Sequence, residues 1–545
     1  MSQRTYITTP IYYVNDKPHI GHAYTTTVCD IYARFMRFAG REVFFLTGTD
    51  EHGLKVETSA ADRGITPQAL ADENAAEFRS AMSMLQLEFD DFIRTTDLDH
   101  VRQVQAFVTR LREAGAVYLG EFEGWYDEGQ EEYHTETQAR ELDYKSPING
   151  RPLVRAREKN YYFRLSSFQE KLEKLFEDHP DFVRPPARRN EVLGRLREGL
   201  ADVPMSRTNF SWGVAMPGDP EHVIYVWIDA LMNYITALGL GEPESDRYSA
   251  RSRYWPPAYH VIGKEILWFH AVIWPAMLMA LDLPLPQCVY AHSFWIREGR
   301  KMSKTLGNFI DLPTIERYVG RYGLDAWRYF MATQGPLGAT DADFADVHFH
   351  EVYHTDLVNT VGNCSSRVSA MIGRYFDGAV PGESPGGRRL TIAEHDWPAL
   401  CAEAVRHSEA AMDRLDLAGS IGAALGLIRR VDAFINLTEP YKLARDDSRR
   451  DELGAILYQC AEVIRIASLL LWPVMPGKCE ELWQAMEIQI DPRAGRLHEL
   501  AEWGGLAQGQ GIRKTALFPR VDRSPSGDGS PSGGDAACAA RLSSD

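Results

Sequence analysis

The 545-residue sequence lacks the features that would place it in a membrane or an oxidising compartment. It has no run of about 18 apolar residues, which argues against a transmembrane helix and a membrane partner. The apolar stretches at 262–283 and 464–474 are interrupted by charged residues, His or Pro. Strand-like residues follow Met1 almost at once, so no signal peptide is expected. The seven cysteines form no C-x-x-C pair, so we expect reduced thiols and a cytoplasmic location.

An excess of basic residues is also lacking. The formal net charge of −17 argues against a general nucleic-acid binder, although it allows a local basic surface. Arginines cluster at 184–197 and 297–328, and a solvated face explains each cluster as readily as a binding site does. The length exceeds what one core supports, which predicts about two to four domains.

The pattern along the chain predicts an α/β region followed by a helical bundle. Strand-like and helix-like runs alternate over 1–116 and resume over 224–296, so the intervening 117–223 is interpreted as an insertion that splits one sheet. Amphipathic helical segments fill 347–521, after a connecting region at 297–346, and indicate a bundle. The Ser/Gly/Pro-rich end, 522–545, is expected to be disordered.

The first strand, helix and strand carry two polar clusters. The stretch RTYITTPIYYV is rich in β-branched and aromatic residues, the next segment has helical spacing, and REVFFLTGTDEHG reads as a second strand. A strand–helix–strand unit predicts parallel strands. Ligands of such sheets bind at the carboxyl ends of the strands, which is where His19–His22 and Thr49–Gly53 are expected.

Two short motifs suit a polyphosphate. In PHIGH, Gly21 lets a ligand approach a helix N-terminus, and His19 and His22 offer hydrogen bonds to phosphate oxygens. In GRKMSKTLGN, Lys301 and Lys304 place two ammonium groups on a glycine-flanked loop. Helix capping and a solvated basic turn are the ordinary explanations of each motif taken alone.

Together the two motifs resemble the signature of class I aminoacyl-tRNA synthetases. With the stretches TTPIYYVNDKPHIGHAYTTT, FFLTGTDEHG, YVWIDALMNY and HVIGKEILWFHAVIWPAML, the chain resembles the methionyl-tRNA synthetase family over about 6–486. The resemblance implies a Rossmann-type parallel sheet in two halves, 1–116 and 224–296. It also implies a connective insertion at 117–223, a KMSK loop and stem-contact region at 297–346, and an anticodon-binding bundle at 347–521.

The resemblance implies roles for particular residues. Asp50 would hold the substrate ammonium. ATP would contact His19, Gly21, His22, Lys301 and Lys304, together with Gly263 and Glu265; Glu265 replaces the family's usual Asp at the ribose. The implied methionine-binding side chains are Ile11, Tyr13, Trp227, Ala230, Leu231, Tyr234, Ile266, His270 and Trp274. Aromatic neighbours suit a thioether, and His270 and Trp274 are four apart, which predicts one helix face.

Two departures from the family pattern alter its expected partners. The positions of a zinc knuckle hold Asp127, Gln130, Ser146 and Asn149. None of these is the thiolate or imidazole that structural zinc prefers, so no zinc is expected.

The second departure lies in the bundle. The resemblance assigns anticodon reading to Asn363 and Arg367, and Tyr441 stands where the family has Trp. Tyr still stacks on an unpaired base.

The implied reaction joins methionine to tRNA(Met), including the initiator tRNA, with ATP and Mg²⁺. Methionine attacks the ATP α-phosphate, and the terminal ribose hydroxyl of the tRNA then attacks the methionyl adenylate. We expect the additional domain that makes some relatives dimers to be absent, and therefore expect a monomer. Other class I synthetases, a nucleotidyltransferase and a non-catalytic tRNA-binding paralogue remain as alternatives.

Overall fold

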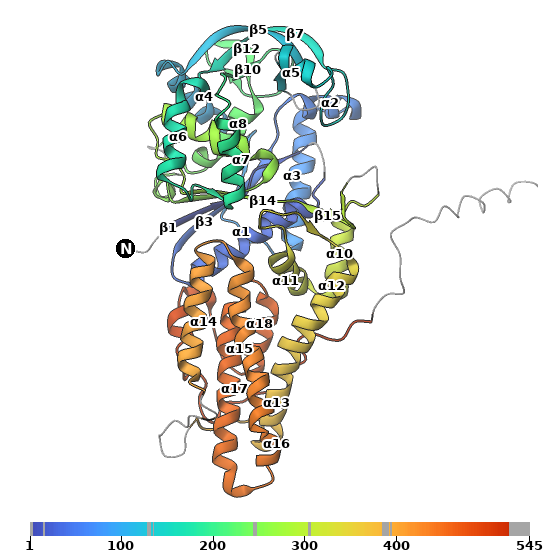
Figure 1. The fold of residues 1–545 in the computed structure, drawn as a ribbon, viewed down its shortest axis with the longest axis vertical. Coiled ribbons are helices and arrows are strands. Elements are labelled where there is room, and N and C mark those ends of the chain that lie inside the picture. Colours follow the sequence, from blue (N-terminus) through green and yellow to red (C-terminus); the bar gives the residue numbers. More distant parts are fainter. Residues whose placement is uncertain are drawn as a thin grey trace, which may run out of the picture. The chain divides into compact units, whose positions relative to one another are not determined.

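A computed structural model describes residues 4–14, 17–127, 132–134, 136–242, 248–302, 307–383, 392 and 395–522. The chain divides into two compact units (Figure 1). The first unit comprises Met1–Pro18, Arg41–Ser293 and Leu337–Ala339. The second comprises His19–Gly40, Phe294–Pro336 and Thr340–Asp545. Residues 523–545, for which disorder is predicted, lie outside the described part.

A parallel sheet organises the first unit. Its strands are β1 (Arg4–Thr8), β2 (Tyr12–Tyr13), β3 (Glu42–Asp50), β4 (Asp91–Arg94), β8 (Val183–Arg184), β13 (Ala258–Gly263) and β14 (Cys288–His292). The order is β2-β3-β1-β13-β14-β8, and β4 also pairs with β3. The run VFFLTGTD of β3 is entirely buried, as expected for a strand of a parallel sheet covered on both faces. The predicted parallel pairing of the first two long strands is confirmed.

Two antiparallel sheets and several helices complete the first unit. Strands β5 (Val117–Asp127) and β7 (Val154–Phe163) form a long pair flanked by β6 (Glu132–His134) and β9 (Val203–Pro204). A smaller sheet joins β10 (Ser206–Arg207), β12 (Asp219–Ile224) and β11 (Ala215–Met216). The α-helices are α2 (Leu54–Arg63), α3 (Pro67–Met84), α4 (Leu98–Glu113), α5 (Glu136–Glu141), α6 (Gln169–Asp178), α7 (Pro186–Leu196), α8 (Val226–Thr236) and α9 (Trp274–Ala280).

The second unit is dominated by helices. They are α1 (Ile20–Phe38), α10 (Leu312–Tyr322), α11 (Leu324–Gln334), α12 (Asp346–Val352), α13 (Asn363–Tyr375), α14 (Trp397–Met412), α15 (Leu417–Thr438), α16 (Pro440–Leu443), α17 (Arg450–Leu471), α18 (Pro476–Ala485) and α19 (Leu497–Leu500). A small sheet contains β15 (Trp295–Arg297), β16 (Arg300–Lys301) and β17 (Ala342–Asp343). Helices α14, α15 and α17 pack together as a bundle, and the predicted helical character of this region is confirmed (Figure 1).

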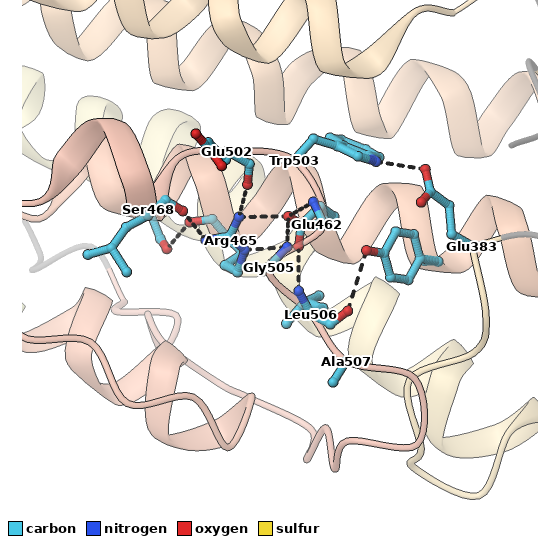
Figure 2. A network of polar contacts seen from close by, with 12 residues as sticks. Glu383, Glu462, Arg465, Ser468, Glu502, Trp503, Gly505, Leu506 and Ala507 are labelled. Carbon is cyan, nitrogen blue, oxygen red and sulfur yellow. Dashed lines mark hydrogen bonds and ion pairs between the residues drawn. The ribbon is translucent and has the colours of Figure 1, made fainter.

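Helix α17 is the core helix of the bundle. Among the described residues, the span Asp447–Leu471 is long and apolar enough to cross a membrane, but its apolar window is completely buried inside the protein. The helix also carries a buried ion pair: Arg465 donates to Glu462 from Nε at 2.9 Å and from Nη2 at 2.6 Å. Figure 2 shows that the Glu462 carboxylate also faces the chain at 504–506, where it accepts three backbone N–H groups. The pair therefore fastens a C-terminal loop to the bundle.

A second buried ionic cluster fixes α1 within its unit. Asp30 accepts from Arg34 Nε at 2.9 Å and from Arg328 Nη2 at 2.6 Å. Arg328, on α11, also donates to the carbonyls of Pro473 and Val474 just after α17. The two guanidinium groups share the Asp30 carboxylate, and the carbonyls give Arg328 further acceptors, so the burial of these groups is tolerated.

Candidate active site

The carboxyl end of β3 presents a fixed acidic segment. Asp50 ends the strand and pairs in register with Tyr13 of β2. The carboxylate of the next residue, Glu51, is completely buried and accepts from Thr49 Oγ1 and Arg94 Nε, each at 2.7 Å, and from the Thr96 hydroxyl. The backbone beside Asp50 is therefore held by bonds that reach the end of β4 and the turn after it.

Most of the residues expected to bind methionine gather in the core of the first unit. Leu231, Tyr234 and Trp274 belong to its main buried cluster. Ile11, Tyr13, Trp227 and Ile266 pack against that cluster as partly buried side chains. Ala230 is buried on α8 beside Leu231. The fold thus brings together side chains from separate segments of the sequence.

Hydrogen bonds fix the protonation of His270. Its Nδ1 lies 3.0 Å from the Ile266 carbonyl, which only accepts, so Nδ1 carries the proton. Its Nε2 lies 2.8 Å from the Tyr234 hydroxyl and accepts the proton of that hydroxyl. Burial lowers the pKa of His270 to about 4, which keeps the ring neutral at pH 7. Both ring nitrogens are thus engaged within the protein, and Tyr234 presents its hydroxyl oxygen in a defined orientation.

A second histidine supports the same tyrosine. The Trp274 indole N–H donates to His260 Nε2 at 3.3 Å, so Nδ1 of His260 carries the proton and donates to Thr8 Oγ1 at 2.8 Å. Burial lowers the pKa of His260 well below its usual value. The His260 ring lies against Tyr234, with centroids 4.1 Å apart. Strands β1 and β13 thereby hold the tyrosine ring in place.

The segment that carries His270 is a π-helical turn, Phe269–Ile273, and not the α-helix that the spacing predicts. Residues four apart lie close to one full turn apart in a π turn as well, so His270 and Trp274 still lie on one side of the segment. Both rings still neighbour Tyr234, at centroid distances of 5.7 and 6.0 Å.

Sequence reasoning missed Phe269 and His260. The Phe269 ring stacks on the Trp227 ring, with centroids 4.0 Å apart and an interplanar angle of 12°. His260 lies inside the apolar run of β13. A single histidine in such a run indicates a buried polar contact, so the sequence could have pointed to it. Phe269 gives no such signal, because an aromatic residue in an apolar helix is ordinary.

At the end of β13, Gly263 leaves room for a neighbouring carboxylate. A Cβ on Gly263 would lie 2.3 Å from Glu265 Oε2. Glu265 is exposed and its carboxyl group folds back over this glycine. A larger residue at this position would have to displace the Glu265 carboxyl group, which is the flexible end of an exposed side chain.

In the second unit, the PHIGH motif caps α1 with its own histidines. Gly21 N–H donates to His19 Nδ1 at 3.0 Å, and His19 N–H donates to His22 Nδ1 at 3.3 Å. In each neutral ring the proton therefore lies on Nε2. Burial and the adjacent His19 lower the pKa of His22 well below its usual value. A Cβ on Gly21 would lie 2.9 Å from the His19 ring, so the motif needs glycine at this position.

The structure brings the second motif into the same unit as the first. Strands β15 and β16 form a hairpin whose turn residues, Glu298 and Gly299, both have positive φ, as in a type I′ turn. Lys301 is exposed on β16, and Lys304 lies outside the described residues. Beyond the loop, Ile20 N–H donates to the Ile310 carbonyl at 3.1 Å, at the first residue of α1.

The expected anticodon residues lie on neighbouring helices of the second unit. Asn363 begins α13 and is exposed. Arg367, one turn later, donates to Asn436 Oδ1 at 3.0 Å and lies 3.8 Å from Asp432. Tyr441 is 45% exposed on α16, with its hydroxyl donating to Glu439 at 2.8 Å.

The positions matched to a zinc knuckle include a hydrogen-bonded loop. Ser146 N–H donates to the Arg151 carbonyl at 2.7 Å, and Arg151 N–H donates to Asn149 Oδ1 at 2.9 Å. Asp127 is buried, and Gln130 lies outside the described residues. Within the described ranges, no group of three or more His, Cys, Asp or Glu side chains is arranged to hold a metal ion.

Comparisons with known proteins agree on one family. The family model described as tRNA synthetases class I (M) matches residues 5–142 and 139–369. A methionine–tRNA ligase of Halalkalibacterium halodurans is 42% identical over 95% of this chain and 78% of its own length. One from Bacillus subtilis is 39% identical over 95% of this chain and 78% of its own.

A solved structure adds the fold. Mycobacterium tuberculosis methionyl-tRNA synthetase in complex with methionyl-adenylate matches with a TM-score of 0.87 and 36% identity. The match covers 95% of this chain and 100% of that one.

Proposed function

We propose how this chain works from one premise: it belongs to the methionine–tRNA ligase family of class I aminoacyl-tRNA synthetases. It is a ligase that uses ATP to attach methionine to tRNA(Met). Membership of this family decides against the other class I amino-acid specificities, the nucleotidyltransferase and the non-catalytic paralogue. The single observation that carries the assignment is the match over 95% of the chain to a structure with methionyl-adenylate.

In the first unit, the proposal assigns methionine to the cluster around Tyr234. Asp50 binds the substrate ammonium, and Ile11, Tyr13, Trp227, Ala230, Leu231, Ile266, His270 and Trp274 surround its side chain. The hydrogen bond from the Tyr234 hydroxyl to His270 at 2.8 Å supports this assignment because it holds the aromatic ring of Tyr234 in one place. Aromatic and polarizable neighbours suit sulfur.

The nucleotide roles are assigned within each unit separately. In the second unit, His19 and His22 donate from Nε2 to phosphate oxygens, next to Gly21. Lys301 and Lys304 stabilise the charge of the departing pyrophosphate. In the first unit, Glu265 accepts from the ribose hydroxyls beside Gly263.

The reaction has two steps. An oxygen of the methionine carboxylate attacks the ATP α-phosphorus, the bond to the bridging oxygen breaks, and pyrophosphate leaves. The 2′-hydroxyl of the tRNA's terminal ribose then attacks the adenylate carbonyl carbon, and AMP leaves. Positioning and charge complementarity carry both steps, without a covalent enzyme intermediate.

Metal requirements follow from the chemistry of the available ligands. Mg²⁺ suits this reaction as the counter-ion of the nucleotide, because it prefers phosphate and water oxygens to a dedicated protein cage. We expect no zinc at 117–223, because Asp127, Ser146 and Asn149 are poor ligands for structural zinc.

The bundle is proposed to read the CAU anticodon of tRNA(Met), including the initiator tRNA. Asn363 and Arg367 offer hydrogen bonds to base edges, and the exposed Tyr441 ring offers a stacking surface. A monomer in a bacterial-type cytoplasm completes the proposal.

Aminoacylation of total tRNA with ATP, Mg²⁺ and each labelled amino acid in turn tests the function. Charging by methionine alone, onto tRNA with a CAU anticodon, is expected. Charging by another amino acid would contradict the assigned methionine site. A Trp227→Ala variant should weaken methionine use far more than ATP use, and equal effects would refute the role of Trp227.

A further inference from the structure

A buried acidic residue of the first unit joins two histidines that the proposed function leaves without a role. Asp229 Oδ2 lies 2.7 Å from His52 Nδ1, and Asp229 Oδ1 lies 2.8 Å from His100 Nε2. The other nitrogen of His100, Nδ1, lies 2.7 Å from the Thr236 hydroxyl. All four side chains are buried, with at most 6% of any one residue exposed.

The chemistry of these contacts fixes the direction of each hydrogen bond. An ionised carboxylate only accepts, so both histidines donate an N–H to Asp229. Desolvation opposes the charge, but the hydrogen bonds from His100 and His52 outweigh it and lower the pKa of Asp229 to about 2. Asp229 is therefore ionised at pH 7, with each oxygen satisfied by one imidazole.

The network joins the two segments that carry the proposed methionine contacts. His52 follows Asp50 by two residues at the end of β3. Asp229 lies in the first turn of α8, between Trp227 and Ala230. One carboxylate thus connects the segment proposed to hold the ammonium group with the helix proposed to hold the side chain. His100, on α4, supports the carboxylate from a third element.

The segment at the end of β3 that carries Asp50 and His52 is also held on its other side. Glu51 is fixed by Arg94 and the Thr49 hydroxyl, and its carbonyl accepts the Trp212 indole N–H at 2.6 Å. The His52 ring meets Trp212 edge-on at a centroid distance of 5.5 Å. Glu51 and His52 therefore leave the backbone around Asp50 little freedom of its own.

We propose that His52, Asp229 and His100 are positioning residues for methionine. They set the separation between the Asp50 carboxylate and the Trp227 side chain, and so match the site to the length between an α-ammonium group and a thioether. This inference rests on the proposed function. It assigns no chemical step to the three residues, because none is proposed to touch the substrate.

The test is methionine-dependent exchange of pyrophosphate into ATP, with KM measured separately for methionine and ATP. His52→Ala removes the donor, whereas His52→Asn keeps an N–H near the Nδ1 position. We expect His52→Ala to raise the methionine KM roughly ten- to hundredfold, the range of one hydrogen bond to a charged group. The KM for ATP should stay within about twofold, and His52→Asn should recover most of the loss.

His222→Ala is the matched control. This histidine is 8% exposed in the same unit, and its Nδ1 lies 3.0 Å from Ser206 Oγ, a residue outside the proposed methionine contacts. The variant should reduce thermal stability without changing the ratio of the two KM values. His100→Ala and His100→Gln form a second pair, because Gln keeps a donor near the Nε2 position; they decide the question if His52→Ala fails to fold.

The outcomes separate the inference from the function on which it rests. If wild-type protein exchanges pyrophosphate with methionine, but His52→Ala and His100→Ala change both KM values equally or neither, the positioning role is wrong. The same holds if His52→Asn behaves as His52→Ala does. If the wild-type protein shows no methionine-dependent exchange, the proposed function itself fails.

Discussion

Replacing Glu462 by Gln should destabilise the bundle far more than the same change in an exposed ion pair. The carboxylate accepts Arg465 Nη2, Gly504 N and Gly505 N on Oε1, at 2.6 to 2.9 Å. Its Oε2 accepts Arg465 Nε at 2.9 Å and Leu506 N at 3.2 Å. A Gln amide placed at Oε2 would set its own N–H groups against these two donors (Figure 2).

The expected loss of unfolding free energy depends on the Arg465 charge, which the substitution leaves without a counter-ion. The Arg465 side chain is 3% exposed, so Glu462→Gln leaves a buried guanidinium without its counter-ion. Breaking a buried pair in this way costs about 3–5 kcal/mol. The control is Glu452→Gln, which breaks an equally spaced pair with Arg449 at the start of α17, with side chains 36% and 48% exposed. Exposed pairs contribute about 0–1 kcal/mol.

Urea unfolding followed by circular dichroism measures both variants. Glu462→Gln should lower the unfolding midpoint clearly, and Glu452→Gln should leave it nearly unchanged. Pyrophosphate exchange per folded molecule should be unaffected by either, because both residues lie in the bundle. Equal, small shifts for the two variants would refute the reasoning, since the buried charge would then have found compensation.

Three further predictions concern individual residues. Burial lowers the pKa of His292 from 6.5 to about 4. The stability that the neutral ring contributes to the fold is therefore complete above pH 6.5 and is lost as pH falls to 4. The variant His292→Asn keeps the donor to the Ser293 carbonyl. Between pH 6.5 and 4, its free energy of unfolding in urea titrations should therefore fall by about 3 kcal/mol less than that of the wild-type protein. An equal fall for the two proteins would contradict the lowered pKa. Gly21→Ala should displace the His19 ring. Pyrophosphate exchange should then fall at least about a hundredfold, with an unchanged melting temperature. Near-normal exchange would argue against a role of the PHIGH motif in phosphate binding. Arg367→Gln should reduce charging of tRNA roughly tenfold or more but leave pyrophosphate exchange intact. A loss of both activities would contradict the proposed contact between Arg367 and the anticodon.

Much of the fold can be predicted from patterns that the sequence displays openly. The buried run of β3 and the helical spacing after His22 predict parallel strands joined by a helix, because each element shows its own hydrophobic period. The bundle is equally visible, since α14, α15 and α17 repeat apolar residues at helical spacing. The two PHIGH histidines stand out because they lie where a strand pattern gives way to a helix pattern.

The contacts that fix the site are harder to foresee. The π turn at Phe269–Ile273 differs from an α-helix by its hydrogen-bonding register, which residue types do not reveal. Asp229 meets His100 from a position 129 residues away, and no local period links them. The partners of Glu462 include backbone N–H groups more than forty residues away, and backbone groups leave no trace in a sequence.

The π turn holds one residue more than the helix between β13 and α9 requires. A π turn closes hydrogen bonds one residue later than an α turn. Deleting one residue from Phe269–Ile273 would let the segment close as an α-helix and leave α9 near its present orientation, whereas a deletion from a regular α-helix rotates all that follows by about 100°. Trp274 would then still face the His260 nitrogen to which it donates. The segment should therefore tolerate the loss of one residue better than the regular helix after it, so its length is a looser constraint than the length of α9.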